Sequence, residues 1–399
     1  MGVTMSWRSS PLVLREPLRI SRSTMDRRDA VTVRLDHAGH TGYGEVVTSV
    51  FAGLGLDRIH AGLTVLRSRT TGYATPEALH TELPAVVAGL HPGTAAAFDA
   101  ALHDLLGRLA GRPVHRLVGA PAPGAVPTAY TIGLVSPTEA GRVAGRLVAA
   151  GFRILKLKAG DDHDVARVAA VRAAAPDARL LLDPNGGWTA EAAVRRLDAL
   201  AGYRLDAVEQ PIAAGQLDRL AWVAARTPVP VVADEDAATE ADLPRLAGVV
   251  AGVNIKLAKC GGIRAATRMV TAAGEHGLAV MLGCLVASSL GIAPALHLAG
   301  YARWVDLDGH LLLADDPWTG LGGHDGTLRP TGTPGLGVTP RRPDPLDPAG
   351  SAPPPDPTAS AQPAASAHPA ASIQPAASIQ PAASTQPAAS IQPAAEVIR

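Results

Sequence analysis

The chain has 399 residues, a formal net charge of zero, and arginines that are scattered rather than clustered. This pattern argues against a basic nucleic-acid-binding face, and no apolar run has the length of a membrane span or of a signal-peptide core. Because its only cysteines are Cys260 and Cys284, a disulfide framework is excluded as well. We therefore expect a cytoplasmic protein with no nucleic-acid and no membrane partner.

Residues 1–122 are expected to form an α+β domain. The alternating VTVRL and the turn-rich HAGHTGYGEVV predict a small antiparallel sheet. The helical segments PEALHTELPAVVAGL and GTAAAFDAALHDLLGRLAG follow it. We expect this domain to cap the open end of the next one.

Residues 123–339 alternate short apolar runs with Ala-rich amphipathic stretches. The runs cover residues 126–134, 153–160, 178–185, 204–211, 229–235, 252–259, 279–285 and 304–309. The intervals between the first seven runs hold helical patterns such as PTEAGRVAGRLVAAG, which end at glycine as helix C-caps do. Eight strands with intervening helices predict an α/β fold, a (β/α)7β TIM-like barrel whose chemistry lies at the carboxyl ends of the strands.

Residues 340–399 are rich in Pro, Ala, Ser and Asp, and from Gln362 onward they repeat hexamers such as QPAASI. A proline in every repeat opposes both helix and sheet, and at most one isoleucine per repeat buries too little apolar surface. We predict a disordered tail, with a short-period solenoid as the alternative.

Lysine is confined to two pairs, Lys156 with Lys158 and Lys256 with Lys259, among 36 basic residues. Arginine stays protonated, whereas a lysine can act as a general base once its pKa is lowered. Lys156 and Lys158 are two residues apart and would share one strand face, so each ammonium is expected to help lower the pKa of the other. The two pairs are therefore candidate general bases.

Three carboxylates end the third, fourth and fifth runs: Asp183, Glu209 and Asp234, at spacings of 26 and 25 residues. One strand-plus-helix unit separates each from the next, so the three are expected to converge. Converging like charges need a cation among them, and an all-oxygen set suits Mg²⁺ best, while Mn²⁺ also fits. Lys158 lies one unit before this set and Lys256 one unit after it, so they would approach a substrate α-carbon from opposite sides and exchange its proton through an enediolate.

The ordered set KLK, DPNGGW, EQP, ADE and NIKLAKCGG resembles the muconate-lactonizing subgroup of the enolase superfamily over residues 10–335. The segment AAFDAALHDLLGRLAGRPVHRLVGA is similar to that family's capping helices. The resemblance implies acid–base roles for Lys158 and Lys256, and Mg²⁺ ligation by the three carboxylates. It also implies that Lys156 touches the substrate carboxylate and that Asn185 and Glu235 support the metal ligands.

The eighth run narrows the substrate. Asp306 and Asp308 share one strand face in VDLDG and would suit an ammonium group, and this DxD resembles the motif by which dipeptide epimerases hold the substrate's N-terminus. By the same resemblance, the remaining substrate contacts are implied for Thr131, Cys284, Leu285 and Val286. Many relatives carry Glu three residues after that cysteine, where this chain has Ala287. The seventh run has no histidine, which argues against sugar-acid dehydration of the mandelate type.

The segment PLRISRSTMDRRD corresponds to the loop that closes over the active site in this family. Arg19 and Arg22 either contact an acidic side chain of the substrate, as in L-Ala-D/L-Glu epimerases, or are solvated charges. We expect Arg22 to bind substrate.

The leading hypothesis is thus an isomerase, a Mg²⁺-dependent dipeptide epimerase, with a dipeptide as its small-molecule partner. Alternatives are o-succinylbenzoate synthase or N-succinylamino acid racemase, muconate cycloisomerase, and a non-catalytic peptide-binding protein. Family members are often symmetric, so a homo-oligomer stays open.

Overall fold

A computed structural model describes residues 2–343. The chain begins with an antiparallel meander of β1 (Thr4–Ile20), β2 (Ser23–His37) and β3 (His40–Val47). Strands β1 and β2 pair from Thr4 opposite Asp36 to Ile20 opposite Ser23, so Ser21 and Arg22 form the tip of a long hairpin. At the other end, Ala38 and Gly39 have φ values of 50° and 79°, the left-handed conformation that tight hairpin turns require.

Five helices follow the meander: α1 (Leu56–Thr70), α2 (Pro76–Thr81), α3 (Leu83–Val86), α4 (Pro92–Leu109) and α5 (Val114–Leu117). Helix α4 lies directly on β3, because Gly42 and Gly44 leave no side chain between them. A Cβ at Gly44 would lie 2.0 Å from the carbonyl oxygen of Ala97, and one at Gly42 would lie 2.3 Å from that of Ala101. The sheet and helices share a core that includes Val33, Phe98 and Leu102.

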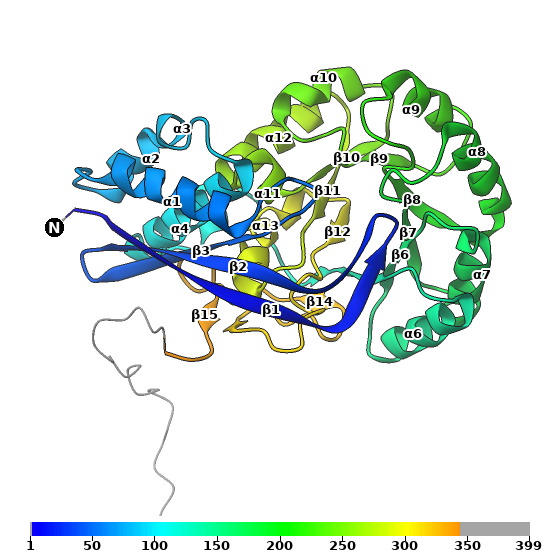
Figure 1. Ribbon diagram of the computed structural model, residues 1–399, viewed down its shortest axis with the longest axis horizontal. Helices are drawn as coiled ribbons and strands as arrows, with labels where there is room; N and C mark the ends of the chain where they lie inside the picture. The colour runs from blue at the N-terminus through cyan, green and yellow to red at the C-terminus, as the bar shows by residue number, and fades with distance from the viewer. Residues whose placement is uncertain (1, 344–399) are drawn as a thin grey trace, which may run out of the picture. The chain divides into compact units, whose positions relative to one another are not determined.

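The eight predicted runs all form strands of one parallel sheet in the order β12-β11-β10-β9-β8-β7-β6-β5 (Figure 1). The strands are β5 (Ala129–Ile132), β6 (Ile154–Lys158), β7 (Arg179–Asp183), β8 (Leu205–Glu209), β9 (Val231–Ala233), β10 (Gly252–Ile255), β11 (Ala279–Gly283) and β12 (Trp304–Asp306). Side chains join the first and last strands: the Leu307 N–H donates to Thr128 Oγ1 at 2.9 Å, and the Thr131 N–H donates to Asp308 Oδ2 at 2.6 Å. The sheet is therefore a nearly closed barrel.

Helices connect consecutive strands. They are α6 (Pro137–Ala149), α7 (Asp164–Ala174), α8 (Ala190–Ala199), α9 (Leu217–Ala224), α10 (Leu243–Leu246), α11 (Leu257–Cys260), α12 (Ile263–Glu275) and α13 (Ser289–Leu296). Short 3₁₀ turns also occur in the described part of the chain, at η1 (Ala201–Tyr203), η2 (Glu240–Asp242) and η3 (Ala299–Tyr301). Between β9 and β10 the helix is only the single turn α10, with Pro244 in its first turn.

The floor of the barrel is closed by an apolar cluster that includes Ile154, Leu181, Met281 and Trp304. The indole Nε1–H of Trp304 donates to Asp206 Oδ2 at 3.0 Å. Because this end is filled, the polar ends of the strands at the opposite mouth are where a ligand can enter.

The C-terminal part of the body forms small antiparallel pairs. They involve β4 (Val126–Pro127) with β14 (Thr327–Leu328), and β13 (Trp318–Thr319) with β15 (Thr339–Pro340). The predicted α/β barrel with an antiparallel-sheet cap is thus confirmed, whereas a domain boundary at residue 122 stays a prediction. Pro340 belongs to β15, and the repeats of the predicted tail lie outside the described residues. Within residues 2–343, no helix has the length and apolarity needed to cross a membrane.

Candidate active site

The predicted lysines and acids lie at the carboxyl ends of consecutive barrel strands. Lys158 and Asp183 end β6 and β7 in register with each other, and Glu209 ends β8. Asp234 and Lys256 directly follow β9 and β10. Strands β6 and β10 are four steps apart in an eight-stranded barrel, so the two lysines come from opposite walls.

Lys156 lies among the carboxylates. Its buried Nζ is 3.0 Å from Asp183 Oδ2, 2.6 Å from Glu209 Oε2 and 2.7 Å from Asp306 Oδ2. Burial alone would lower the pKa of Lys156, but these three acids outweigh it and hold that pKa well above its ordinary value. The pKa of Lys156 is therefore raised, whereas the sequence alone predicts a lowered one.

The two candidate acid–base lysines each contact an acid of the row. Lys158 Nζ donates to Asp183 Oδ2 at 2.5 Å, and Lys256 Nζ donates to Asp234 Oδ2 at 2.6 Å. Burial opposes the charge on Lys256, yet Asp234 and Glu209 raise its pKa. The same pairing holds the pKa of Asp234 well below its usual range despite complete burial.

A divalent cation fits the acids as a donor set. Burial first, and then the charge of Asp183, raise the pKa of Glu209 to about 7, so this site favours added positive charge. Asn185 Oδ1 is buried and accepts no hydrogen bond, and the buried Glu209 Oε2 has the Lys156 ammonium beside it at 2.6 Å. Among residues 2–343, no three His, Cys, Asp or Glu side chains are already gathered as a metal-binding group. The ammonium groups of Lys156 and Lys256 instead neutralise the acids.

Backbone and amide groups orient the acids. The Asn185 N–H donates to Asp183 Oδ1 at 2.9 Å, and the Asn185 amide Nδ2 donates to Asp183 Oδ2 at 3.3 Å. Asn254 Nδ2 donates to Glu209 Oε1 at 2.8 Å. Lys259 donates to both the carboxylate and the carbonyl of Asp234. Asn254 and Lys259 were not assigned these contacts from sequence, although both stand in the NIKLAK segment that points to Lys256.

The acidic pair at the end of β12 lies beside the same cluster of lysines and acids. Asp306 accepts from Lys156, and Asp308 accepts from the Thr131 N–H. Burial, followed by the charge of Asp306, raises the pKa of Asp308 to about 7. Cys284 Sγ lies 4.0 Å from Asp308 Oδ1. Buried and close together, the two acids would gain from a further positive group.

The loop after β11 holds the other residues expected to contact substrate. Val286 is buried and Leu285 partly buried. The carbonyl of Leu285 packs against Gly309, where a Cβ would lie 2.3 Å from it. This loop therefore lies beside the acidic pair.

Arg22, at the tip of the β1–β2 hairpin, reaches the barrel. Its Nη2 is 2.7 Å from Glu235 Oε1, and its guanidinium lies over the Phe51 ring, 4.0 Å from the centroid. Burial, and then Asp234, raise the pKa of Glu235. The backbone carbonyl of Arg19 accepts from the Leu134 N–H at 2.8 Å. Sequence reasoning missed Phe51, because no local pattern links it to residue 22.

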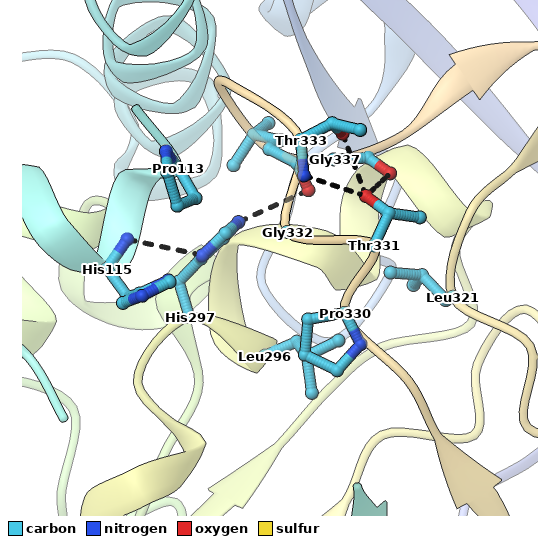
Figure 2. A pocket seen from close by; sticks show the side chains of 11 residues that line it. Pro113, His115, Leu296, His297, Leu321, Pro330, Thr331, Gly332, Thr333 and Gly337 are labelled. Carbon is cyan, nitrogen blue, oxygen red and sulfur yellow. Dashed lines mark hydrogen bonds between the residues drawn. The ribbon is translucent and has the colours of Figure 1, made fainter. Parts of the chain in front are cut away.

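Two buried histidines lie away from the acids, beside a small cavity (Figure 2). The His115 backbone N–H donates to His297 Nδ1 at 3.2 Å, and His297 Nε2 donates to the Leu336 carbonyl at 3.2 Å. Burial lowers the pKa of His297 to about 4. His297 is thus a neutral link between helix α13, the start of α5 and the C-terminal segment.

Together the fold and the cluster define a barrel enzyme with acid–base side chains at the carboxyl ends of its strands. Residues 3–119 match the mandelate racemase/muconate lactonizing enzyme N-terminal domain, and residues 139–344 match the enolase C-terminal domain-like family. The chain therefore belongs to the enolase superfamily, in its mandelate racemase/muconate lactonizing enzyme group. It is an enzyme of the isomerase class.

Named relatives agree with this membership. A hydrophobic dipeptide epimerase from Roseobacter litoralis is 36% identical over 329 residues, 81% of this chain and 95% of the relative. A dipeptide epimerase from Enterococcus faecalis, solved with Mg and L-Leu-L-Tyr, has a TM-score of 0.78 and 30% identity, covering 85% of this chain and 100% of that one. An N-succinyl Arg/Lys racemase structure from Bacillus cereus has a TM-score of 0.79 and 26% identity, and the match covers 85% of this chain and 96% of that one.

Proposed function

We propose that this enzyme is a Mg²⁺-dependent dipeptide epimerase that inverts an α-carbon by proton transfer between Lys158 and Lys256. The observation that carries the proposal is the arrangement of these lysines on opposite walls, with three acids between them and the Asp306–Asp308 pair beside them. A base on one face and an acid on the other is what inversion at carbon requires.

Asp183, Glu209 and Asp234 would hold the cation, for which Mg²⁺ is the first choice and Mn²⁺ also fits. When bound, it would neutralise the charge that develops on the substrate carboxylate as the α-proton leaves. Asn185 and Asn254 keep two of the acids in place. Once Asp234 binds this cation, it would hold the Lys256 ammonium less strongly. The pKa of Lys256 would then return toward its ordinary range.

The lysines perform the proton transfer. The neutral amine of one takes the α-proton, and the C–H electron pair moves into the substrate carboxylate. The ammonium of the other then gives a proton to the opposite face of the same carbon. Lys156 stays charged and would bind a substrate carboxylate oxygen, consistent with its raised pKa.

Asp306 and Asp308 would bind the substrate ammonium, with the Thr131 backbone and the Cys284, Leu285 and Val286 loop lining the rest of the pocket. The acidic pair favours a free amino terminus over a succinylated one, which would bring no positive charge. N-succinylamino acid racemisation is the second candidate, because a racemase of that kind is among the similar structures.

Arg22 would contact an acidic side chain of the substrate. To do so it must exchange Glu235 for that carboxylate, since the two are now an ion pair. The exposed Phe51 offers an apolar surface at the same place. Both acidic and hydrophobic dipeptides are therefore candidate substrates.

A dipeptide library in D₂O with Mg²⁺, read by mass spectrometry, tests the proposal. It predicts deuterium at one α-carbon of particular dipeptides and none in their N-succinylated counterparts. Exchange confined to succinylated amino acids would support the second candidate instead, and exchange of neither class would refute the proposal.

A further inference from the structure

Asp99 joins the capping helices to the segment that follows Lys256. It lies on α4 and is 1% exposed. Its Oδ2 accepts the N–H of Ile263, the first residue of α12. His103 Nδ1 donates to the Asp99 carbonyl at 2.8 Å and lies 3.3 Å from Asp99 Oδ1. The carboxylate therefore holds the start of α12 through Oδ2 and has the His103 ring beside Oδ1.

The start of α12 needs this contact because its N-cap is Gly262, which has no side chain to accept a backbone N–H. A Cβ at Gly262 would lie 2.7 Å from Asp99 Cγ. Gly262 also has a φ of 118° and Gly261 a φ of 103°, which favour glycine. The glycine pair thus lets a carboxylate from another part of the chain replace the missing cap.

One helical turn connects this cap to Lys256. In α11, the Lys256 carbonyl accepts the N–H groups of Lys259 at 2.8 Å and Cys260 at 3.2 Å. The Leu257 carbonyl accepts those of Gly261 and Gly262, both at 3.0 Å. Helix α11 packs on α4. The cap at Gly262 is therefore joined to Lys256 by one hydrogen-bonded turn.

The other lysine has a different support. The loop after Lys158 is held by Asp164, a barrel residue that accepts the Gly160 N–H at 3.0 Å and the Trp188 indole N–H at 2.9 Å. The partners of Asp164 come from the barrel, and Ser21 of the β1–β2 hairpin also lies against Gly160. The two walls of the site thus depend on different buried carboxylates.

We infer that Asp99 is a positioning residue for Lys256. Through Asp99, the packing of α4 on the barrel aligns the Lys256 side of the site and not the Lys158 side. The inference rests on the proposed function for its catalytic consequence. Its structural part, that Asp99 orders residues 256–263, stands independently of any substrate.

Backbone amide exchange tests the structural part in the full chain. In Asp99→Ala, amides of the peptide spanning residues 256–266 should exchange faster, while those of 153–162 keep the parental rate. Asp99→Asn keeps an acceptor oxygen for the Ile263 N–H and should restore protection. Unchanged exchange in 256–266, or an equal increase in both peptides, would overturn the inference.

Catalysis provides the second readout, with L-Ala-L-Glu, L-Ala-D-Glu, L-Leu-L-Tyr and L-Leu-D-Tyr in D₂O with Mg²⁺. One epimer of the active pair should not exchange in Lys256→Ala. Deuterium exchange into that same epimer should be about 10- to 100-fold slower in Asp99→Ala than in the parental enzyme, because small misplacements of a base are costly. The other epimer should keep its parental rate. Equal slowing of both epimers would contradict the inference. If the parental enzyme exchanges none of the four, that result counts against the proposed function, and amide exchange still decides the role of Asp99.

Glu45→Ala is the matched control. Glu45 also joins the cap to the barrel, since it accepts the Ser288 N–H at 2.8 Å and the Ser288 hydroxyl at 2.5 Å, at the start of α13. If general loosening of the cap explained the result, this variant would produce the same selective slowing and the same exposure of residues 256–266. The inference predicts that it produces neither.

Discussion

Lowering the pH should destabilise this protein through His297. The residue is 4% exposed, and its ring is hydrogen-bonded at both nitrogens: Nδ1 accepts from the His115 backbone N–H and Nε2 donates to the Leu336 carbonyl (Figure 2). Burial lowers its pKa from 6.5 to about 4. A proton added at Nδ1 would remove the acceptor for the His115 N–H and leave a charge without a partner.

The sign follows from linkage. Between the folded pKa and the unfolded pKa, the unfolded chain binds more protons, so stability falls as the pH drops below 6.5 and levels off below about 4. The full difference between the folded and unfolded pKa of His297 corresponds to about 3 kcal/mol of folding free energy, at about 1.4 kcal/mol per pKa unit. Roughly 2 kcal/mol of this should be lost between about pH 7.5 and pH 5.

Denaturant unfolding of the parental protein and of His297→Asn at both pH values measures the effect. Asparagine supplies one acceptor and one donor but does not titrate in this range. The variant should be less stable at the higher pH, and its deficit should shrink by roughly 2 kcal/mol at the lower one. A constant deficit would refute the assignment of a buried neutral His297.

Two further predictions concern the site. Replacing Asp183 by Asn, Glu209 by Gln or Asp234 by Asn should each weaken Mg²⁺ binding, measured by calorimetry. Each change should also lower turnover by at least about 100-fold, because changes even to groups behind metal ligands cost about 10- to 100-fold. Full activity in excess chelator would contradict the metal assignment. Replacing both Asp306 and Asp308 by Asn should weaken dipeptide binding by about 3 kcal/mol, or about 100-fold in kcat/KM. Unchanged steady-state kinetics would show that the pair does not bind the substrate ammonium.

Much of the barrel could be predicted because its signals are local. Apolar runs alternate with amphipathic stretches, and an acid or lysine stands at the end of each central run, as at Asp183 and Glu209. Parallel strands bring such ends together whatever the details of the helices. This is why all eight runs became strands.

Contacts that depend on docking could not be predicted in this way. Arg22 and Glu235 are 213 residues apart, and Asp99 and Ile263 are 164 apart. No periodicity relates them, because they meet only when the cap packs on the barrel. The raised pKa of Lys156 was missed for a related reason: sequence placed Lys158 beside it, but the structure surrounds it with three acids.

The central claim is that Lys158 and Lys256 serve opposite faces of one α-carbon. The most direct measurement is solvent-deuterium incorporation into each of two epimeric dipeptides by Lys158→Ala and by Lys256→Ala. Each variant should lose net epimerisation but still exchange one epimer, and the two variants should exchange opposite epimers. Exchange of the same epimer by both variants, or near-parental epimerisation by Lys256→Arg, would contradict the account, because arginine keeps the charge but cannot act as the base.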